Sequence, residues 1–371
     1  NNLATINNPS GNNWTASYVV ASSDTDGEVA YAIDFSDTAL NAGVQVSSGS
    51  GGVMVDKIAP TLSAVHIVSS NANNVYAKVG DTITLTFTSG ETVQTPAVTI
   101  AGHSVTPTAS GNNWTATYIM ASEDTEGLIA FSINFSDLAG NAGVAVTSVN
   151  DTSSVTFDKT VPTGTIVING GTGITNSPNV SLTLSATDNL SGVSQMKFNN
   201  GNGGYSDPEV YFTSKTWSLS ASGDGLKTVR VKFIDAAGNE TITGIPSTII
   251  LDTTPPSAVI SYSISHAVKT GDLQTITATL SEPILDFPVL QISISGSNTA
   301  SATNMTKVDS THYTYTHTVG AGEGTSSIIL SLATDAALNA VASVPTDGIF
   351  TVDNTAPIIT KLGSDPDTFI Y

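Results

Sequence analysis

Apolar and polar residues alternate along most of the chain with a period of two, which is the pattern of β-strands that bury one face. In residues 81–88 (DTITLTFT) the alternation places Ile83, Leu85 and Phe87 on one side. Gly, Asn, Asp and Pro interrupt these runs at the spacing of turns, and no segment has convincing helical periodicity. The pattern therefore predicts an all-β protein.

The chain also repeats itself. The phrase SGNNWTASY at Ser10 returns as SGNNWTATY at Ser110. Four marks recur in a fixed order: an aromatic that opens a strand, an acidic or glycine-rich loop, a D-x-A-[GL]-N turn, and a junction with an aspartate. The aromatics are Trp14, Trp114, Trp217 and Tyr313, the turns begin at Asp37, Asp137, Asp235 and Asp335, and the junction aspartates are Asp56, Asp158, Asp252 and Asp353. Successive junctions are 102, 94 and 101 residues apart, the size of one β-sandwich domain.

These junctions predict five segments. Residues 1–57 match only the C-terminal part of a repeat (repeat one), and 355–371 match only the first strand of another. Between them lie repeat two (58–159), repeat three (160–253), which has a variant hairpin, and repeat four (254–354).

Repeat two should contain seven strands in two antiparallel sheets that pack face to face. The expected strands are 61–69, 82–88, 97–101, 104–108, 114–120, 128–136 and 143–158. In every repeat the recurring Trp, or Tyr313 in repeat four, should be a core anchor.

Charge and composition narrow the function. Thirty-one acidic residues against eleven basic ones give a net charge of -20, which repels phosphate backbones and makes nucleic acid an unsuitable partner, whereas divalent cations are natural counterions. Cysteine is absent, so disulfides, thiolate catalysis and Cys-ligated zinc are excluded. No apolar run reaches the roughly 18 residues of a membrane span. Abundant Ser, Thr, Asn and Gly indicate an extracellular, secreted or cell-surface location. Residues 1–13 lack a signal-peptide pattern, so we expect a removed leader or a longer parent chain.

Several motifs resemble a known family. The D-x-A-G-N turns, the D-x-T-x-P junctions, KVGDTITLTFTSGE and KTGDLQTITATLSEP are similar to tandem bacterial Ig-like domains, which form the stalks of large surface adhesins and related cell-envelope proteins. GDGLKTVRVKFIDAAGN resembles a variant that also occurs as an accessory domain of secreted bacterial enzymes. The resemblance implies seven-stranded Ig-like sandwiches arranged as an elongated rod, a spacer or adhesive role, and Ca²⁺ at domain junctions. Leu40 and Leu338 depart from the glycine of the turn, and repeat three is shorter.

Topology gives a separate reason to expect cations. In a seven-stranded sandwich, the loops after strands two, four and six gather at the end, or pole, of the domain where the linker enters. The acids of the D-x-A-[GL]-N turn, of the loop after the second strand and of the linker should therefore converge there. A hard cation that takes about six to eight oxygens would relieve their repulsion. We predict interdomain Ca²⁺ sites built from Asp56, Glu91, Asp137 and Asn141; from Asp158, Asp188, Asp235 and Asn239; and from Asp252, Glu282, Asp335 and Asn339.

The far pole of the preceding domain should face each site with further acids: Asp24, Asp26 and Glu28, then Glu123, Asp124 and Glu126, then Asp224. The alternative is purely structural. D-x-A-G-N would then be a tight turn whose Asp accepts backbone amides, and the linker Asp would only cap that turn.

Catalytic motifs are missing. The five histidines have no zinc-like spacing, and His312 and His317 fall on opposite faces of one strand because five is odd. Neither a nucleophile elbow nor a phosphate loop occurs, so we expect no enzyme activity. The segment 196–212 is unique to repeat three, and its Tyr205 and Tyr211 are candidates for a sugar-stacking platform; the alternative is a long hairpin whose aromatics cover the core edge.

The sequence thus favours a non-enzymatic structural or adhesive cell-surface protein whose repeat region is a rigid extended stalk. Its partners would be neighbouring repeats or subunits, and surface glycans or other cells. Two alternatives stay open: a self-assembling extracellular filament or sheath subunit joined by strand complementation between chains, and a carbohydrate-binding accessory region of a secreted enzyme.

Overall fold

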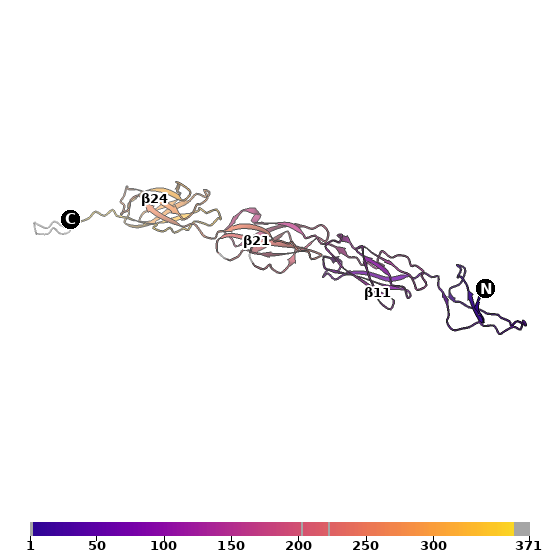
Figure 1. The fold of residues 1–371 in the computed structure, drawn as a ribbon. Coiled ribbons are helices and arrows are strands. Elements are labelled where there is room, and N and C mark those ends of the chain that lie inside the picture. Colours follow the sequence, from indigo (N-terminus) through magenta and orange to yellow (C-terminus); the bar gives the residue numbers. More distant parts are fainter. Residues whose placement is uncertain (1–2, 202, 222, 360–371) are drawn as a thin grey trace. The chain divides into compact units, whose positions relative to one another are not determined.

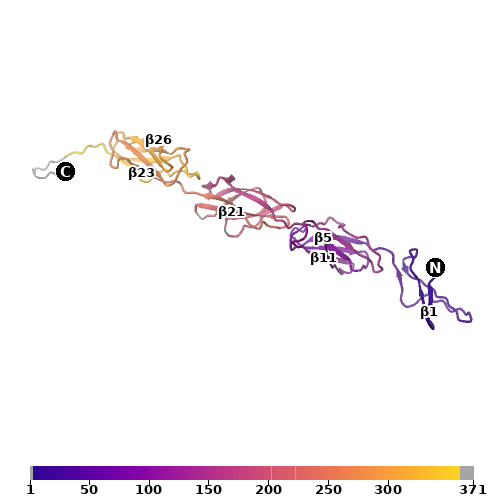
Figure 2. The same ribbon diagram turned by 45° about the horizontal axis from the view of Figure 1, so that its top comes forward.

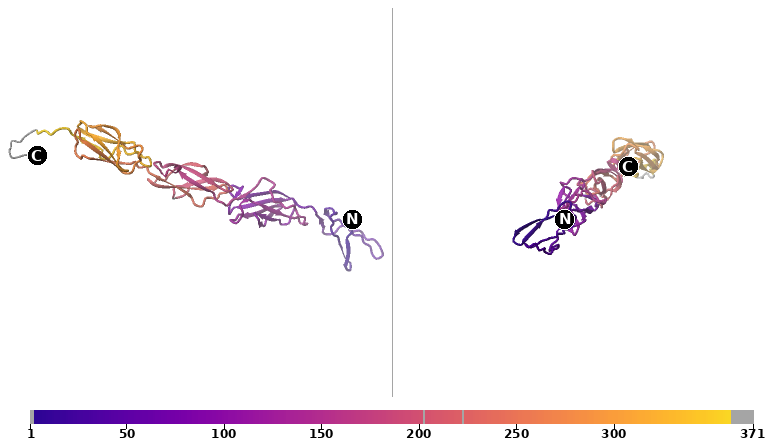
Figure 3. Two further views of the ribbon diagram at one scale, coloured as in Figure 1. Left: turned by 90° about the horizontal axis from the view of Figure 1, so that it is seen from above. Right: turned by 90° about the vertical axis from the view of Figure 1, so that its right-hand side faces the viewer.

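β-Strands dominate the protein. The computed structural model describes residues 3–201, 203–221 and 223–359, and Figure 1 and Figure 3 show strands in each part of the chain. Within these residues the helical content is one short 3₁₀ element, η1 (Asn169–Gly171). The predicted all-β class is confirmed.

The chain divides into two compact units. The first comprises Asn1–Pro162, Thr187–Ser194 and Ile234–Glu240, and the second comprises Thr163–Ala186, Gln195–Phe233 and Thr241–Tyr371. The domain boundaries expected from the repeat spacing stay a prediction, and the repeat names below denote sequence segments only.

Repeat two is a sandwich of two antiparallel sheets with a small third sheet of mixed pairing. The first sheet has the order β10 (Thr108–Ser110), β11 (Asn113–Ile119), β7 (Thr82–Ser89), β5 (Leu62–Ser69); β5 and β11 are labelled in Figure 2. The second has the order β13 (Phe131–Asn134), β8 (Ala97–Ile100), β9 (His103–Val105), and a small third sheet has the order β12 (Gly127–Leu128), β14 (Thr156–Phe157), β6 (Tyr76–Ala77).

The core of repeat two comes from the alternating faces of these sheets. Ile83, Leu85 and Phe87 on β7 are buried, and Ile100 and Ile133 bury themselves from the second sheet in the same cluster. Register places Trp114 opposite Phe87, and their rings stack with centroids 6.3 Å apart. Trp114 is only 8% exposed, as expected of a core anchor.

Three predicted strands of repeat two differ from the observed ones. The expected strand 128–136 divides into β12 and β13, which pair in different sheets. The expected strand 104–108 becomes β9 and β10, which pair in different sheets on either side of Pro107, a residue that has no amide to donate. The expected strand 143–158 is reduced to β14. Gly143 begins it beneath the ring of Phe135, where a Cβ would lie 2.3 Å from the ring carbons.

Repeat three contains a three-stranded and a five-stranded sheet. The orders are β15 (Thr163–Ile168), β17 (Asn179–Thr187), β20 (Ser214–Ser218) and β16 (Ile174–Thr175), β22 (Ile245–Leu251), β21 (Gly225–Asp235), β18 (Val193–Asn199), β19 (Glu209–Val210).

Repeat four contains two four-stranded sheets around a core that includes Ile276, Leu290 and Leu330. The orders are β23 (Ala258–Tyr262), β24 (Leu273–Leu280), β28 (His312–Thr318), β27 (Thr306–Lys307) and β26 (Ala300–Asn304), β25 (Gln291–Gly296), β29 (Gly324–Ser331), β30 (Ile349–Val352). His317 is buried and His312 is not, as the odd spacing on β28 predicts.

Repeat one differs from repeat two in the burial of its aromatic side chains. Its strands are β1 (Thr5–Ser10), β2 (Asn13–Ser17), β3 (Gly27–Glu28) and β4 (Met54–Val55). Trp14 is 65% exposed and Phe35 is 54% exposed, although their equivalents Trp114 and Phe135 are buried. The expectation that every repeated aromatic anchors a core is therefore wrong for Trp14. The predicted last segment, 355–371, lies outside the described residues from 360 onward.

Candidate metal centres

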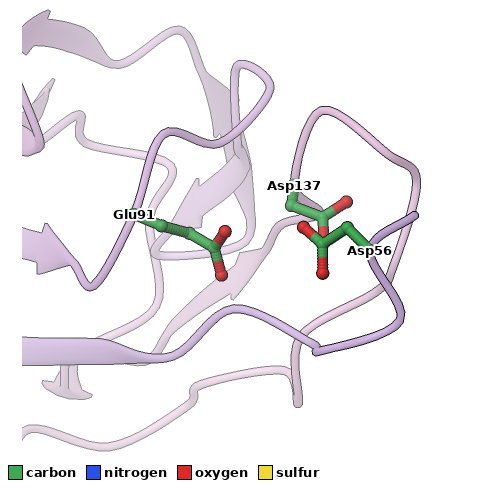
Figure 4. A group of neighbouring side chains, drawn as sticks. All are labelled: Asp56, Glu91 and Asp137. Carbon is green, nitrogen blue, oxygen red and sulfur yellow. The ribbon is translucent and has the colours of Figure 1, made fainter. Parts of the chain in front are cut away.

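Three groups of carboxylates gather among the described residues, one each in repeats two, three and four. In every group a linker aspartate meets one acid from the loop after the second predicted strand and the first Asp of the D-x-A-[GL]-N turn. The groups are Asp56, Glu91 and Asp137; Asp158, Asp188 and Asp235; and Asp252, Glu282 and Asp335, with one oxygen of each residue within 4.8 Å of the others. These are the acids that the topology argument brought together. Figure 4 shows the carboxylate of Glu91 pointing towards those of Asp56 and Asp137.

The turn itself fixes the first acid of each group. In repeat two, Asp137 Oδ1 accepts the backbone amides of Gly140 (2.7 Å) and Asn141 (2.8 Å). The corresponding Asp235 Oδ1 accepts Asn239 N at 2.8 Å, and Asp335 Oδ1 accepts Asn339 N at 2.9 Å. The structural role proposed for this motif is therefore present together with the clustering.

The asparagine of the turn ties the turn to the linker. Asn141 Nδ2 donates to Asp137 Oδ2 (2.7 Å) and to the carbonyl of Asp56 (3.0 Å). The same pair of bonds recurs for Asn239, with the carbonyl of Asp158 (3.0 Å), and for Asn339, with that of Asp252 (2.8 Å). The sequence predicts these three asparagines to be metal ligands. Their side-chain nitrogens hold the linker in place, and only their side-chain carbonyl oxygens are suited to a cation.

The linker aspartates use one oxygen for their own turn. In each of them, Oδ1 accepts the backbone amide of the residue two positions later. The bonds are Ile58 N to Asp56 (3.0 Å), Thr160 N to Asp158 (3.0 Å) and Thr254 N to Asp252 (3.2 Å). In repeat three, Asp158 Oδ2 also accepts Ser191 N at 3.0 Å, which draws the Asp188 loop towards the linker.

Protonation equilibria differ between equivalent turns. Burial opposes ionisation of Asp137, but the hydrogen bonds from the side chain and backbone of Asn141 and from Gly140 together leave its pKa below the usual value. Burial raises the pKa of Asp235, and the charges of Asp158 and Asp188 add to that effect against the bonds from Asn239. In repeat four, burial and then the charges of Asp252 and Asp335 raise the pKa of Glu282.

The donor set suits a hard divalent cation. Every group offers carboxylate oxygens alone, the ligands that Ca²⁺ prefers and that soft metals do not. In repeat three the fit is strongest, because Asp158 and Asp235 are buried and Asp188 Oδ1 is a buried oxygen with no hydrogen-bond partner among the described residues. An orphaned buried carboxylate oxygen is costly unless a cation or a proton compensates it.

The acids expected from the preceding far pole do not join these groups. Instead, one acid in each acidic loop accepts the backbone amide of the residue after the junction aspartate. The bonds are Asp26 to Lys57 N (3.0 Å), Glu126 to Lys159 N (2.8 Å), Asp224 to Thr253 N (2.9 Å) and Glu323 to Asn354 N (2.8 Å). We call these four acids the linker clamps.

The clamps had a signal in the sequence that the search for metal ligands overlooked. Each clamp acid directly precedes a glycine: Gly27, Gly127, Gly225 or Gly324. All four glycines have φ between 105° and 126°, a conformation that other residues rarely adopt. The dipeptide [DE]-G therefore accompanies all four clamps, although it also occurs once outside them, at Asp347-Gly348.

The sugar-platform candidates lie in different surroundings. Tyr211 is part of the core edge: its ring meets Phe233 edge-on, with centroids 5.7 Å apart, and its hydroxyl accepts Ala186 N at 3.0 Å. Tyr205 is partly exposed, and two lysine ammonium groups lie over its ring. A shared platform of both tyrosines thus gains no support from their contacts.

Comparisons with known proteins find structural neighbours but no matching family. No family model and no curated protein matches the sequence. Among solved structures, the Escherichia coli adhesin FdeC covers 80% of this chain and 100% of its own, with 16% identity and a TM-score of 0.38. A tetra-tandem repeat from the extending region of a large adhesion protein covers 95% and 91%, with 18% identity and a TM-score of 0.31. Three N-terminal domains of the bacteriophage RB49 outer capsid protein Hoc cover 80% and 100%, with 14% identity and a TM-score of 0.33.

These TM-scores are below 0.5, and neither the fold nor the function of this chain is inferred from them. In the part of the chain that the structure describes, no helix is long and apolar enough to cross a membrane.

Proposed function

We propose that this chain is a non-enzymatic structural protein of the cell surface, and that its repeats form an extended stalk. One observation carries the proposal: the same linker–loop–turn group of carboxylates recurs in repeats two, three and four. An active site would occur once, whereas a device that fixes each linker must recur with the linker. The net charge of -20 favours solubility and extension over collapse.

Ca²⁺ is the cofactor of this proposal. Asp158, Asp188 and Asp235 would hold it in repeat three, and the equivalent acids would hold it in repeats two and four. A bound cation neutralises carboxylates that otherwise repel one another, and it links the linker aspartate to two loops of the following repeat. The bonds from Asn141, Asn239 and Asn339 to the linker carbonyls, together with the linker clamps, would hold the linker backbone on either side of each linker aspartate.

Calorimetry tests the cofactor. Titration of the EDTA-treated chain with Ca²⁺ should give about three sites, and thermal unfolding should shift upward with Ca²⁺ because the ion binds only the folded state. The matched variant Asp188→Asn should lose one site, while Glu123→Gln, an exposed acid outside the groups, should lose none. Equal melting of the wild-type chain in EDTA and in Ca²⁺ would exclude the cation.

Small-angle scattering tests the stalk separately. The full chain should have a maximum dimension that grows by a constant step when one more repeat is included. A compact particle whose size does not follow repeat number would overturn the stalk, whether or not Ca²⁺ binds.

A filament subunit is a second candidate, favoured by one observation. Trp14, Ile33 and Phe35 of repeat one are exposed, while their equivalents Trp114, Ile133 and Phe135 are buried by the other strands of repeat two. Exposed apolar side chains of this kind would be covered if another chain added strands at the edge of the β1–β2 sheet. Sedimentation velocity should then detect oligomers that Trp14→Ser disrupts; a monomer at all concentrations would exclude this function.

A further inference from the structure

Two side chains of repeat two reach the D-x-A-G-N turn of repeat three. Lys78 Nζ donates to the carbonyl of Gly238 at 2.8 Å, and Asn71 Nδ2 donates to the carbonyl of Ala237 at 2.9 Å. All four residues belong to the first compact unit. The internal bonds of the turn use the carbonyls of its first and last residues, so the carbonyls of Ala237 and Gly238 need donors from outside the turn.

A turn in repeat two orients both donors. Asp81 Oδ2 accepts the backbone amide of Lys78 at 2.8 Å and the side-chain amide of Asn71 at 2.6 Å. A bond from Asp81 N to the Lys78 carbonyl (3.1 Å) closes this turn, in which Gly80 has a φ of 92°. We call Asn71 together with the K-x-G-D residues 78–81 the docking corner. Its donors are held by repeat two itself, which reduces the entropy lost when a turn docks on them.

The equivalent turns of repeats two and four have no such contact. In the described ranges, no donor of the protein reaches the matching carbonyls of Ala139 and Gly140, or those of Ala337 and Leu338. The D-x-A-[GL]-N turn therefore does not need a docking corner in order to form. The contact with Lys78 and Asn71 is an addition that is specific to the turn of repeat three.

Repeats three and four differ from repeat two at the corner. In each repeat one carbonyl accepts the amide of the junction aspartate, and the residue after that carbonyl occupies the position of Lys78. The residues are Lys78 after Ala77, Asn176 after Thr175 and Lys269 after Val268. Lys269 begins the same K-x-G-D turn, and its amide donates to Asp272 Oδ2 at 2.9 Å, but its side chain is exposed. The corner that precedes repeat four has the shorter, exposed Asn176 and no lysine.

The fourth residue of each turn matches the corner that precedes it. Gly238 follows the corner with Lys78, and a Cβ at Gly238 would lie only 3.2 Å from Lys78 Nζ. Leu338 follows the corner with Asn176, and its side chain is 65% exposed. Both residues have positive φ, 85° for Gly238 and 73° for Leu338, so the backbone of the turn is alike. A leucine at Gly238 would crowd the ammonium group away from the carbonyl.

We propose that the docking corner is a binding surface for the D-x-A-G-N turn of the following repeat, and that its lysine and the glycine of that turn select each other as neighbours. Lys78 makes a charge-assisted bond, which is about twice as strong as a neutral one. The turn of repeat three is therefore held by repeat two, whereas the turn of repeat four has only its own repeat and its linker. This coupling goes beyond the proposed stalk and its Ca²⁺, because none of these bonds requires a metal.

Hydrogen exchange of the full chain in EDTA tests the contact. The reporter is the Asn239 amide, which donates to Asp235 Oδ1 inside the turn. Lys78→Met replaces the ammonium group with an apolar group of similar length and should accelerate this exchange about tenfold, the effect of losing a hydrogen bond to a charged group. Lys269→Met removes the equivalent, exposed lysine of repeat four and should leave the Asn239 amide unchanged. Unchanged exchange in Lys78→Met would overturn the proposal.

A second pair of variants tests the match between lysine and glycine. Gly238→Leu should accelerate exchange at Asn239 more than Gly140→Leu does at Asn141, whose amide makes the same bond to Asp137 Oδ1. Both changes place leucine at a positive φ, but only Gly238 faces a docking corner. In the double variant Lys78→Met/Gly238→Leu, the lysine change should add nothing, because the same bond is already lost. Equal effects of the two leucine variants would contradict the match.

These outcomes are separate from those of the Ca²⁺ proposal. EDTA removes the cation, so a failure of Ca²⁺ to bind in calorimetry leaves the effect of Lys78→Met intact. Conversely, Ca²⁺ binding at three sites together with unchanged exchange in Lys78→Met would overturn only the docking corner. Far-UV circular dichroism verifies that each variant keeps its β-structure. Asn71→Ala, which removes the neutral bond to Ala237, should accelerate exchange at Asn239 by a smaller factor than Lys78→Met.

Discussion

At the residue scale, the same turn motif gives its aspartate a lowered pKa in repeat two and a raised pKa in repeat three. Asp137 and Asp235 occupy the same position of the same motif and accept the same backbone amide. The pKa of Asp137 is lowered and that of Asp235 is raised, because burial and the charges of Asp158 and Asp188 outweigh the hydrogen bonds in repeat three. The motif therefore sets the geometry of the acid, and its surroundings set its charge.

The asparagine tether gives a prediction at this scale. Asn141→Ala removes the bonds to Asp137 and to the carbonyl of Asp56, and should lower the stability of repeat two by about 1–2 kcal/mol. Scanning calorimetry measures the shift. Asn41→Ala is the matched control, because Asn41 bonds Asp37 in an exposed turn, and its effect should be smaller. Equal effects of the two variants would show that the linker carbonyl contributes nothing.

At the element scale, the acidic loops hold the linkers through hydrogen bonds to their backbone amides. Glu126 accepts Lys159 N and the hydroxyl of Thr160, both at 2.8 Å, and Asn189 Nδ2 donates to its other oxygen at 3.2 Å. One carboxylate thus connects a loop, the linker that follows and the next loop. The clamps recur at Asp26, Asp224 and Glu323, so linker geometry is a property of every repeat.

The Glu126 clamp should depend on pH. Although burial opposes its ionisation, bonds from Thr160, Lys159 and Asn189 hold the pKa of Glu126 below its usual value. A lowered pKa means that the clamp is at full strength above the ordinary pKa of glutamate and is lost as pH falls through the lowered value. Hydrogen exchange at the Lys159 amide, corrected for its intrinsic rate, should therefore accelerate in acid.

The variant Glu126→Ala should produce the same loss of protection at neutral pH, with Glu123→Ala as the control at an exposed neighbouring acid. If the Lys159 amide stays equally protected from exchange in Glu126→Ala, Glu126 does not hold the linker.

The packing of Gly143, two residues after the D-x-A-G-N turn, gives a second prediction at the element scale. Gly143→Ala would place a Cβ 2.3 Å from the ring of buried Phe135 and should destabilise repeat two by about 1–3 kcal/mol. Gly43→Ala meets Phe35 at the same 2.3 Å, but that ring is 54% exposed and free to move, so the loss should be much smaller. Chemical denaturation compares the pair, and equal losses would contradict the argument.

At the scale of the whole molecule, repetition should make the metal groups independent of one another. Glu282→Gln removes one carboxylate from the group in repeat four and should lower the Ca²⁺ stoichiometry from about three to about two, because well-separated sites contribute additively. The thermal transition of repeat four alone should lose its Ca²⁺ dependence. Calorimetry in EDTA and in Ca²⁺ measures both effects, and a loss at all three groups would demonstrate coupling instead.

Much of the local structure could be predicted. The alternation in 82–88 identified β7 to within one residue, and the spacing of the repeats located the turns at Asp137, Asp235 and Asp335. Pairing was harder, because the division of 104–108 between two sheets depends on which neighbours supply hydrogen bonds. Burial was the hardest property to predict: Trp14 and Trp114 share a phrase, yet Trp14 is 65% exposed and Trp114 is 8% exposed.

The sequence by itself determined the period of the alternation, the repeats and the positions of the acids, because these follow from the order of residues along the chain. The predicted order of strands also placed Asp56, Glu91 and Asp137 at one pole. Tertiary structure alone decided how closely these acids meet, and it sent Glu126 to the linker amide instead, because such contacts depend on the paths of loops that are far apart in sequence. It also placed Tyr205 among lysines, since cross-strand neighbours on a sheet are set by strand order and register, which composition does not specify.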